Sequence, residues 1–394
     1  MEFPVNRYRL DTLGCNDTIH FNNAGCSMHP MQVVESICNY LMEEALTGGY
    51  ELAHQRASLL NDFYNLGAEM LHAAPNNIAF VSNATDGFAK ALSSIPWHTG
   101  DVILTTINDY VSSQIQFASL HKRFGVEVVR AANTPQGDVD IDSIETLIKQ
   151  YQPRAISITH IPNNTGMIQP VEQIGDLCEK YDIWYFVDAC QSAGQIPLDV
   201  TSIKCDFLSF SMRKFLRGPR GCGMLYVSDK ALKAGLEPLF IDMRGADWTE
   251  ANKYQPVPDA KRFEYVEQSY GIITGAIAAM RYYLNVGPDQ IALYNAELCA
   301  YARQQLSAIP HIHLQDRGSR LSAIISLTSD RSDPMYFKEI LNRNGINAGA
   351  ASRKFALLDF DQKGVSGAVR ISPHYYNTFE EVDKMIAVIK ENAI

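Results

Sequence analysis

An acid and a lysine follow two neighbouring apolar runs of this 394-residue chain. The run at residues 183–187 ends in Asp188, and the run at residues 207–210 is followed four residues later by Lys214. Short apolar runs closed by polar residues are typical of buried parallel strands. Ligands of open α/β sheets bind beyond the carboxyl ends of such strands, so Asp188 and Lys214 are expected to end neighbouring strands at a binding site.

One cofactor needs such a pair of side chains. Pyridoxal phosphate forms a Schiff base with a lysine and requires an acidic partner at its pyridinium nitrogen. Asp188 can equally cap the end of a strand, and Lys214 can equally be a solvated loop lysine. The two residues alone therefore leave both interpretations open.

Two further loops have residues suited to binding a ligand. Thr85 lies between a strand predicted at residues 78–81 and the following helix, where backbone N–H groups and a hydroxyl can hold a phosphate. An ordinary N-cap is an equal alternative for Thr85. Ala24 and Gly25 follow a short apolar start, and their small size allows the backbone to approach a ligand closely. A plain turn explains these two residues equally well.

The order of elements predicts an α/β protein. Strands and helices alternate between residues 78 and 227, which indicates a mainly parallel sheet with helices on both faces. From about residue 235 long helical patterns alternate with short strands, and Thr378 with Glu381 forms a capping box at the start of the last helix. The expected divisions are an N-terminal arm that packs with the small domain (1–19), a large domain (20–255) and a small α+β domain (256–394).

The composition excludes several classes of protein. The net charge of −10 argues against general nucleic-acid binding, which requires a basic face. The N-terminus lacks a signal-peptide pattern and no apolar run reaches the length of a membrane span, so a cytoplasmic location is expected. The eight cysteines show no CxxC spacing and are expected to be reduced thiols. His311 and His313 have no further ligands nearby, so no metal site is expected.

Three segments carry a family resemblance: VDACQ at 187–191, SFSMRKFLRGPRGCG at 209–223 and VRISPHYYNT at 369–378. Together they resemble the class V aminotransferase-like family of pyridoxal phosphate enzymes, and the resemblance covers essentially the whole chain. It implies a fold-type I enzyme with pyridoxal 5′-phosphate as its cofactor and an amino acid as its substrate. It also implies a homodimer with a shared active site.

The resemblance assigns roles to single residues. Lys214 matches the Schiff-base lysine, and Asp188 matches the acid at the pyridine nitrogen. Asn163 matches a residue near both the cofactor ring and the substrate. The other cofactor-binding residues that the resemblance implies are Thr85, Tyr110, Gln191, Ser211 and Arg213, and the other substrate-binding residues are Arg370, Ala24 and Gly25.

The expected reaction depends on an absent cysteine. Cysteine desulfurases carry a catalytic cysteine on a loop before the carboxylate-binding arginine, whereas residues 345–360 contain none. The motifs are similar to those of the sulfoxide lyases of ergothioneine biosynthesis. The first expectation is therefore a C–S β-lyase that converts a cysteine-derived thioether or sulfoxide to a sulfur fragment, pyruvate and ammonia. A class V aminotransferase or an amino-acid epimerase is the alternative, a cysteine desulfurase ranks below both, and a cofactor-binding regulator without catalysis is the alternative from another class.

Overall fold

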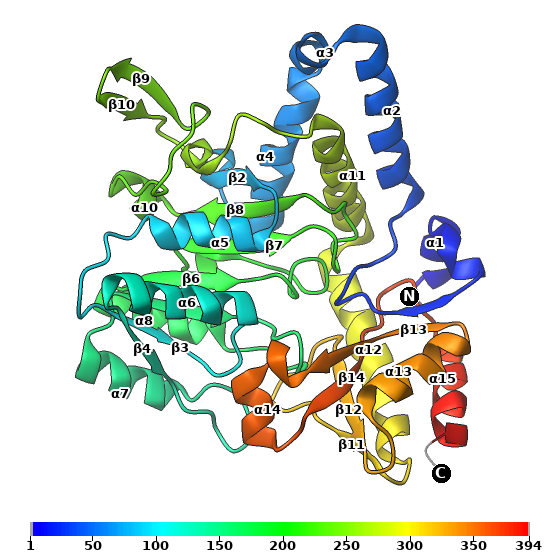
Figure 1. The fold of residues 1–394 in the computed structure, drawn as a ribbon. Coiled ribbons are helices and arrows are strands. Elements are labelled where there is room, and N and C mark those ends of the chain that lie inside the picture. Colours follow the sequence, from blue (N-terminus) through cyan, green and yellow to red (C-terminus); the bar gives the residue numbers. More distant parts are fainter. Residues whose placement is uncertain (1–2, 393–394) are drawn as a thin grey trace.

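The larger of two main sheets contains seven strands and forms the centre of the molecule (Figure 1). The computed structural model describes residues 3–392. In spatial order the strands are β2 (Ile78–Val81), β8 (Gly223–Val227), β7 (Phe207–Ser211), β6 (Trp184–Asp188), β5 (Ala155–Thr159), β3 (Val102–Thr105) and β4 (Glu127–Arg130). The last five strands of this order, β7 to β4, run parallel to one another, and β8 is antiparallel to both of its neighbours.

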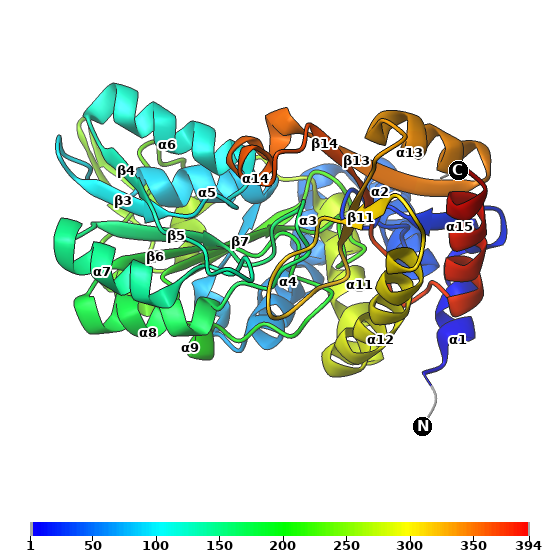
Figure 2. The ribbon, with the colours of Figure 1, turned by 90° about the horizontal axis from the view of Figure 1, so that it is seen from below.

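Helices cover both faces of this sheet, and for that reason every residue of its central strands β5 and β7 is buried. In Figure 2 the helices α5 (Ala84–Ser93) and α6 (Val111–Phe124) lie on one side of the strands. The helices on the opposite side are α7 (Ile141–Tyr151), α8 (Val171–Tyr181) and α9 (Val200–Ile203). The short helix α10 (Asp229–Lys233) follows β8.

The second sheet has five strands, and the earliest strand of the chain belongs to it. Strand β1 pairs in parallel with β13, and β13 pairs antiparallel with β14. The strands in spatial order are β1 (Ile19–Phe21), β13 (Ile346–Ser352), β14 (Gly367–Ile371), β12 (Ile325–Ser329) and β11 (Ile312–Leu314). The helices that accompany them are α13 (Pro334–Arg343), α14 (Leu357–Lys363) and α15 (Phe379–Asn392).

A group of longer helices lies beside the two sheets (Figure 1). Small residues of α11 allow it to pack closely on α2, because a Cβ atom at Gly275 would lie only 2.5 Å from Ile37 Cγ1. The strands β9 (Ala246–Glu250) and β10 (Lys253–Pro256) form a separate hairpin that projects from the body. The helices are α2 (Met31–Thr47), α3 (Gly49–Gln55), α4 (Ala57–Leu71), α11 (Tyr270–Val286) and α12 (Pro288–Ser307).

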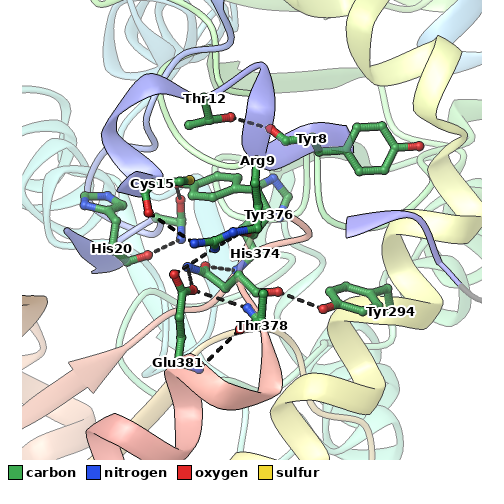
Figure 3. Close-up of polar contacts among 12 residues, drawn as sticks. Tyr8, Arg9, Thr12, Cys15, His20, Tyr294, His374, Tyr376, Thr378 and Glu381 are labelled. Carbon is green, nitrogen blue, oxygen red and sulfur yellow. Dashed lines mark hydrogen bonds and ion pairs between the residues drawn. The ribbon is translucent and has the colours of Figure 1, made fainter. Parts of the chain in front are cut away.

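The N-terminal helix α1 (Val5–Leu10) is bound to the C-terminal segment by one arginine (Figure 3). Arg9 forms an ion pair of 2.7 Å with Glu381 and donates a hydrogen bond of 2.9 Å to the Tyr376 carbonyl. Glu381 also accepts from the Thr378 backbone N–H, and its own N–H donates to the Thr378 hydroxyl. This reciprocal pair is the capping box that the sequence predicts at the start of α15.

The predicted fold class, a mainly parallel α/β sheet flanked by helices, is confirmed. The three-part division of the chain and the cytoplasmic location stay predictions. Among residues 3–392, no helix combines the length and the apolar character needed to cross a membrane.

Candidate active site

Lys214 and Asp188 lie in one cavity at the carboxyl edge of the seven-stranded sheet. Asp188 is the last residue of β6, and Lys214 follows the neighbouring parallel strand β7 by three residues. Each residue is only 8% exposed. Burial raises the pKa of Asp188, while the positive charge of Lys214 and the Cys190 N–H oppose this shift. The site thus holds an acid whose charged form needs a cationic partner.

The cavity has a volume of about 140 Å³ and contains six of the side chains predicted from the sequence. Its walls join the ends of β6 and β7 to the start of α5 and the first turns of α6. The lining residues are Asn83, Ala84, Thr85, Phe88, Tyr110, Ser112, Ser113, Gln116, Asp188, Cys190, Ser209, Ser211, Arg213 and Lys214.

One end of the cavity is suited to an anion. Asn83, not Thr85, is the N-cap of α5, since its side chain accepts the Asp86 N–H at 3.0 Å. Thr85 is therefore not used as a cap, and its exposed hydroxyl lines the cavity beside the helix N-terminus. The Ser211 hydroxyl accepts the Ala84 N–H at 3.0 Å and holds the helix start against β7. Hydroxyls beside a helix N-terminus provide the donors that a phosphate requires.

Tyr110 lies above the lysine on the wall formed by α6. The Lys214 ammonium is 5.8 Å from the centroid of the Tyr110 ring. The Tyr110 backbone is held by its neighbour Asp109, which accepts the Thr159 N–H at 2.5 Å while Thr159 Oγ1 accepts the Tyr110 N–H at 3.2 Å. Burial raises the pKa of Asp109 to about 6, although these hydrogen bonds oppose the shift.

Arg370 forms a second centre next to this cavity. Its Nη1 donates to the Asn163 carbonyl at 3.1 Å, and its Nη2 lies 3.4 Å from Asn22 Oδ1. The Nε is buried without a hydrogen-bond partner, and no carboxylate of residues 3–392 forms an ion pair with the guanidinium. Burial lowers the pKa of Arg370 to about 10, with Arg213 adding to the shift and Tyr110 opposing it. A partly buried cation with a free, buried N–H is suited to bind a carboxylate.

The loop after β1 connects the two centres. The Gln191 side-chain amide donates to the Ala24 carbonyl at 3.1 Å, and Arg213 donates to the Gly25 carbonyl. The Ser27 N–H returns a bond of 2.9 Å to the Arg213 carbonyl. Four predicted residues are therefore not among those that line the cavity. Asn163 contacts Arg370, while Gln191, Ala24 and Gly25 meet at the loop after β1.

Arg217 supports the turn that follows the lysine. It is 1% exposed, and its backbone adopts a left-handed φ of 61°. Its side chain donates to the Met28 carbonyl and the Tyr375 hydroxyl, both at 2.9 Å, and to the Thr12 hydroxyl. The guanidinium also lies 4.4 Å from the centroid of the Tyr376 ring. Arg217 therefore joins the lysine turn to the N-terminal arm and to the C-terminal segment.

Sequence reasoning missed several lining residues. Cys190 lies inside the VDACQ motif between two residues that were assigned roles, and Ser209 is two positions before Ser211 on the same strand. Alternate residues of a strand share a face, so Ser209 could have been found from Ser211. Asn22, which contacts Arg370, gave no such signal because the contact spans 348 positions of the chain.

Comparison with known proteins identifies the family. The model of the aminotransferase class-V family matches residues 19–385, and the chain belongs to this family. A cysteine desulfurase from Synechococcus elongatus is 28% identical over 99% of this chain and 62% of its own length. A probable cysteine desulfurase from Borreliella burgdorferi is also 28% identical, over 99% of this chain and 94% of its own.

A solved structure agrees with this assignment. The apo structure of a cysteine desulfurase from Thermococcus onnurineus NA1 has a TM-score of 0.91 and 25% identity. The match covers 100% of this chain and 98% of that one. The predicted family, fold type and cofactor, pyridoxal 5′-phosphate, are confirmed.

The predicted ranking of reactions is wrong. The sequence favoured a C–S β-lyase that releases pyruvate and ammonia and placed a cysteine desulfurase below an aminotransferase or epimerase. Relatives that match nearly the whole chain are instead named cysteine desulfurases, and the likeness to ergothioneine sulfoxide lyases is not supported. The error came from giving one absent loop cysteine more weight than similarity along the entire chain.

Proposed function

We propose that this chain is a pyridoxal-phosphate-dependent enzyme that removes the sulfur atom from cysteine and leaves alanine. The observation that carries the proposal is the position of Arg370, a partly buried arginine with no acidic partner and an unpaired, buried Nε, beside the cavity that contains Lys214 and Asp188. The first centre fits the cofactor, and the second fits the carboxylate of an amino acid. The relatives named cysteine desulfurase support cysteine as that amino acid.

Two residues would control the reacting atoms. When bound, the cofactor supplies a conjugated ring that accepts the electron pair released at Cα of the substrate. Lys214 would hold the cofactor covalently and, once released, move the proton at Cα. Asp188 would pair with the protonated ring nitrogen. Because burial disfavours an isolated charged Asp188, this partner stabilises the acid as well as the electron sink.

The remaining cofactor contacts follow from the cavity walls. Thr85 and Ser211 lie at the N-terminus of α5, Arg213 lines the same cavity, and these three residues would bind the phosphate. Tyr110 would cover one face of the ring from the side on which it already contacts Lys214. The Gln191 amide uses one of its two N–H groups on the Ala24 carbonyl, and the other would donate to the phenolic oxygen of the cofactor.

The substrate carboxylate would bind between Arg370 and the loop after β1. Asn163 and Asn22 hold the guanidinium from one side, so its free Nε remains for the ligand. The small residues Ala24 and Gly25 follow Asn22 in this loop and would lie beside that carboxylate. A carboxylate fixed in this way orients the Cα–H bond of the substrate relative to the cofactor ring.

The sulfur atom needs an acceptor other than a thiol on the segment before Arg370. Residues 346–371, which form β13, α14 and β14, contain no cysteine. We propose that a low-molecular-weight thiol takes this role in solution. Two thiols then reduce one cysteine to alanine and hydrogen sulfide and become one disulfide, so atoms and electrons balance.

The test follows all products of one substrate. Purified enzyme loaded with pyridoxal 5′-phosphate is given L-cysteine and dithiothreitol, and alanine, sulfide, pyruvate and ammonia are measured in parallel. The expected result is alanine and sulfide in equal amounts, with both lost in Lys214→Ala. Pyruvate and ammonia in place of alanine would show that the proposed reaction is wrong.

We also propose that the enzyme is a homodimer that completes its active sites across the interface. A group of large apolar side chains that are exposed in the single chain supports this proposal. They lie just before and within the β9–β10 hairpin: Leu239, Phe240, Met243 and Trp248. Such side chains mark association surfaces. Light scattering is expected to give twice the chain mass of 44.0 kDa, and Trp248→Lys is expected to shift the mass toward the monomer. A wild-type mass near 44.0 kDa would contradict the proposal.

A further inference from the structure

Helix α14 and the short 3-10 helix before it, Arg353–Phe355, occupy the connection between β13 and β14. Two ion pairs in this connection differ in burial. Lys363 Nζ lies 2.9 Å from Asp359 Oδ2, and these side chains are 1% and 3% exposed. Arg353 and Asp361 form the other pair, with side chains 52% and 47% exposed. Because the two pairs lie so close together in the chain, the exposed pair is a matched control for the buried one.

The buried pair holds a loop of the other sheet. Asp359 Oδ2 accepts a hydrogen bond of 2.7 Å from the Asn164 side-chain amide. Asn164 belongs to the loop after β5, while Asp359 lies in the connection next to Arg370. The Asn164 carbonyl accepts the Ser326 hydroxyl at 2.7 Å, and Ser326 is the cross-strand partner of Arg370. Asn164 is therefore held at both its side chain and its backbone.

The neighbouring carbonyl contacts the substrate arginine. Asn163 C=O accepts Arg370 Nη1 at 3.1 Å, and this carbonyl shares a planar peptide unit with the N–H of Asn164. Movement of Asn164 would therefore move the acceptor that orients the guanidinium. Binding of a carboxylate by two parallel hydrogen bonds depends strongly on that orientation.

We propose that Asp359 is a positioning residue for the substrate carboxylate: through Asn164 and the Asn163 carbonyl it sets the direction of the Arg370 guanidinium. This inference rests on the proposed function, because it takes Arg370 as the carboxylate-binding residue. Lys363 compensates the Asp359 charge in the interior. Burial raises the pKa of Asp359 and lowers that of Lys363, and each residue opposes the shift of the other.

The test compares two double variants that both remove the buried charges. Asp359→Asn with Lys363→Met keeps an oxygen that accepts the Asn164 amide, whereas Asp359→Leu with Lys363→Met does not. We call these the Asn/Met and the Leu/Met variant. Because the Leu/Met variant loses one buried hydrogen bond, its KM for L-cysteine is expected to rise about tenfold, while its kcat stays within about threefold of the wild-type value. The Asn/Met variant is expected to restore the wild-type KM, and Asp361→Asn is expected to leave KM unchanged.

A second measurement does not depend on turnover. Binding of propionate to the cofactor-loaded enzyme is followed by calorimetry, with Arg370→Met as the baseline. The Leu/Met variant is expected to bind propionate about tenfold more weakly than wild type. If the wild type makes pyruvate from cysteine, the proposed reaction fails while this comparison still tests the role of Asp359.

Three results would overturn the inference. The first is a folded Leu/Met variant with wild-type KM and propionate affinity. The second is a failure of the Asn/Met variant to restore affinity although its melting temperature matches that of the wild type. The third is a wild type that binds propionate no better than Arg370→Met, because Arg370 would then not be the carboxylate site.

Discussion

Arg217 is fully buried and Arg370 is partly buried with a buried Nε, and the surroundings of these two arginines near Lys214 differ. Arg217 is surrounded by neutral acceptors and tyrosine rings, and each arm of its guanidinium has a partner. Arg370 has two acceptors on its terminal nitrogens and none on Nε. Neither arginine forms an ion pair with an acid among residues 3–392.

The difference shows how burial of the same side chain can serve structure or function. A guanidinium whose donors are all used contributes to the stability of the chain around it. A guanidinium with a free buried donor costs free energy until a ligand supplies the missing acceptor. We therefore assign Arg217 to the structure of the lysine turn, and Arg370 to the proposed substrate site.

The largest expected effect comes from Arg370→Met. Loss of a bidentate carboxylate contact is expected to lower kcat/KM for L-cysteine by about 10³-fold, with KM raised and kcat lowered together. The melting temperature should stay the same or rise, because the variant removes a partly buried cation without an acidic partner. Steady-state kinetics and thermal unfolding measure the two effects. A clear loss of stability would show that Arg370, like Arg217, stabilises the fold.

Arg217→Met is expected to show the opposite pattern. It leaves the buried Thr12 hydroxyl, Met28 carbonyl and Tyr375 hydroxyl without their donor, which costs about 3–5 kcal/mol of unfolding free energy. Urea unfolding measures this loss. At low temperature, where the variant remains folded, its affinity for propionate should match that of the wild type. Arg217→Lys is expected to restore little of the stability, because an ammonium lacks the planar fork of donors.

The pH dependence gives a further distinction. Since burial lowers the pKa of Arg370 to about 10, its affinity for propionate should be constant between about pH 7 and 9 and fall about tenfold per pH unit above 10. The folded-state pKa lies below the unfolded value, so the folded chain binds fewer protons in this range. The stability cost of Arg370 is therefore present below pH 10 and is relieved as the pH rises. Calorimetry across this range checks the first statement, with Arg370→Met as the pH-independent background.

The smallest expected effect comes from Gly349→Ala on the strand beside Arg370. A Cβ atom there would lie 2.9 Å from Asn22 Oδ1 and 3.2 Å from Arg370 Nε, so the guanidinium must shift by a few tenths of an ångström. KM for L-cysteine is expected to rise roughly threefold to tenfold with little change in kcat. An unchanged KM would mean that substrate binding does not depend on the position of Arg370 Nε, contrary to the comparison with Arg217.

Local patterns in the sequence were sufficient for part of this picture. Apolar runs that end in polar residues located Asp188 and Lys214, and the spacing of Thr378 and Glu381 located a helix start. These features depend on neighbours within a few positions, and the structure reproduces them.

The remainder depends on contacts between distant segments. The environments of Arg217 and Arg370 could not be distinguished from local patterns, because the partners of Arg217 include Thr12 and Tyr375, which lie 205 and 158 positions away. The same applies to Asp359, whose role depends on Asn164, 195 positions earlier. The error about the reaction had a related cause, since it was based on one local segment.

The pairing of β1 with β13 has a consequence for synthesis of the chain. His20 and its partner Asn347 are separated by 327 residues, so β1 is synthesised long before the strand with which it pairs. At about 5–20 residues per second this delay is roughly 16–65 s. During that time the loop that will face Arg370 has no sheet to hold it, and the newly made strand exposes an unpaired edge. Chaperone binding to the nascent chain should therefore concentrate at the segment around β1 until β13 has been made.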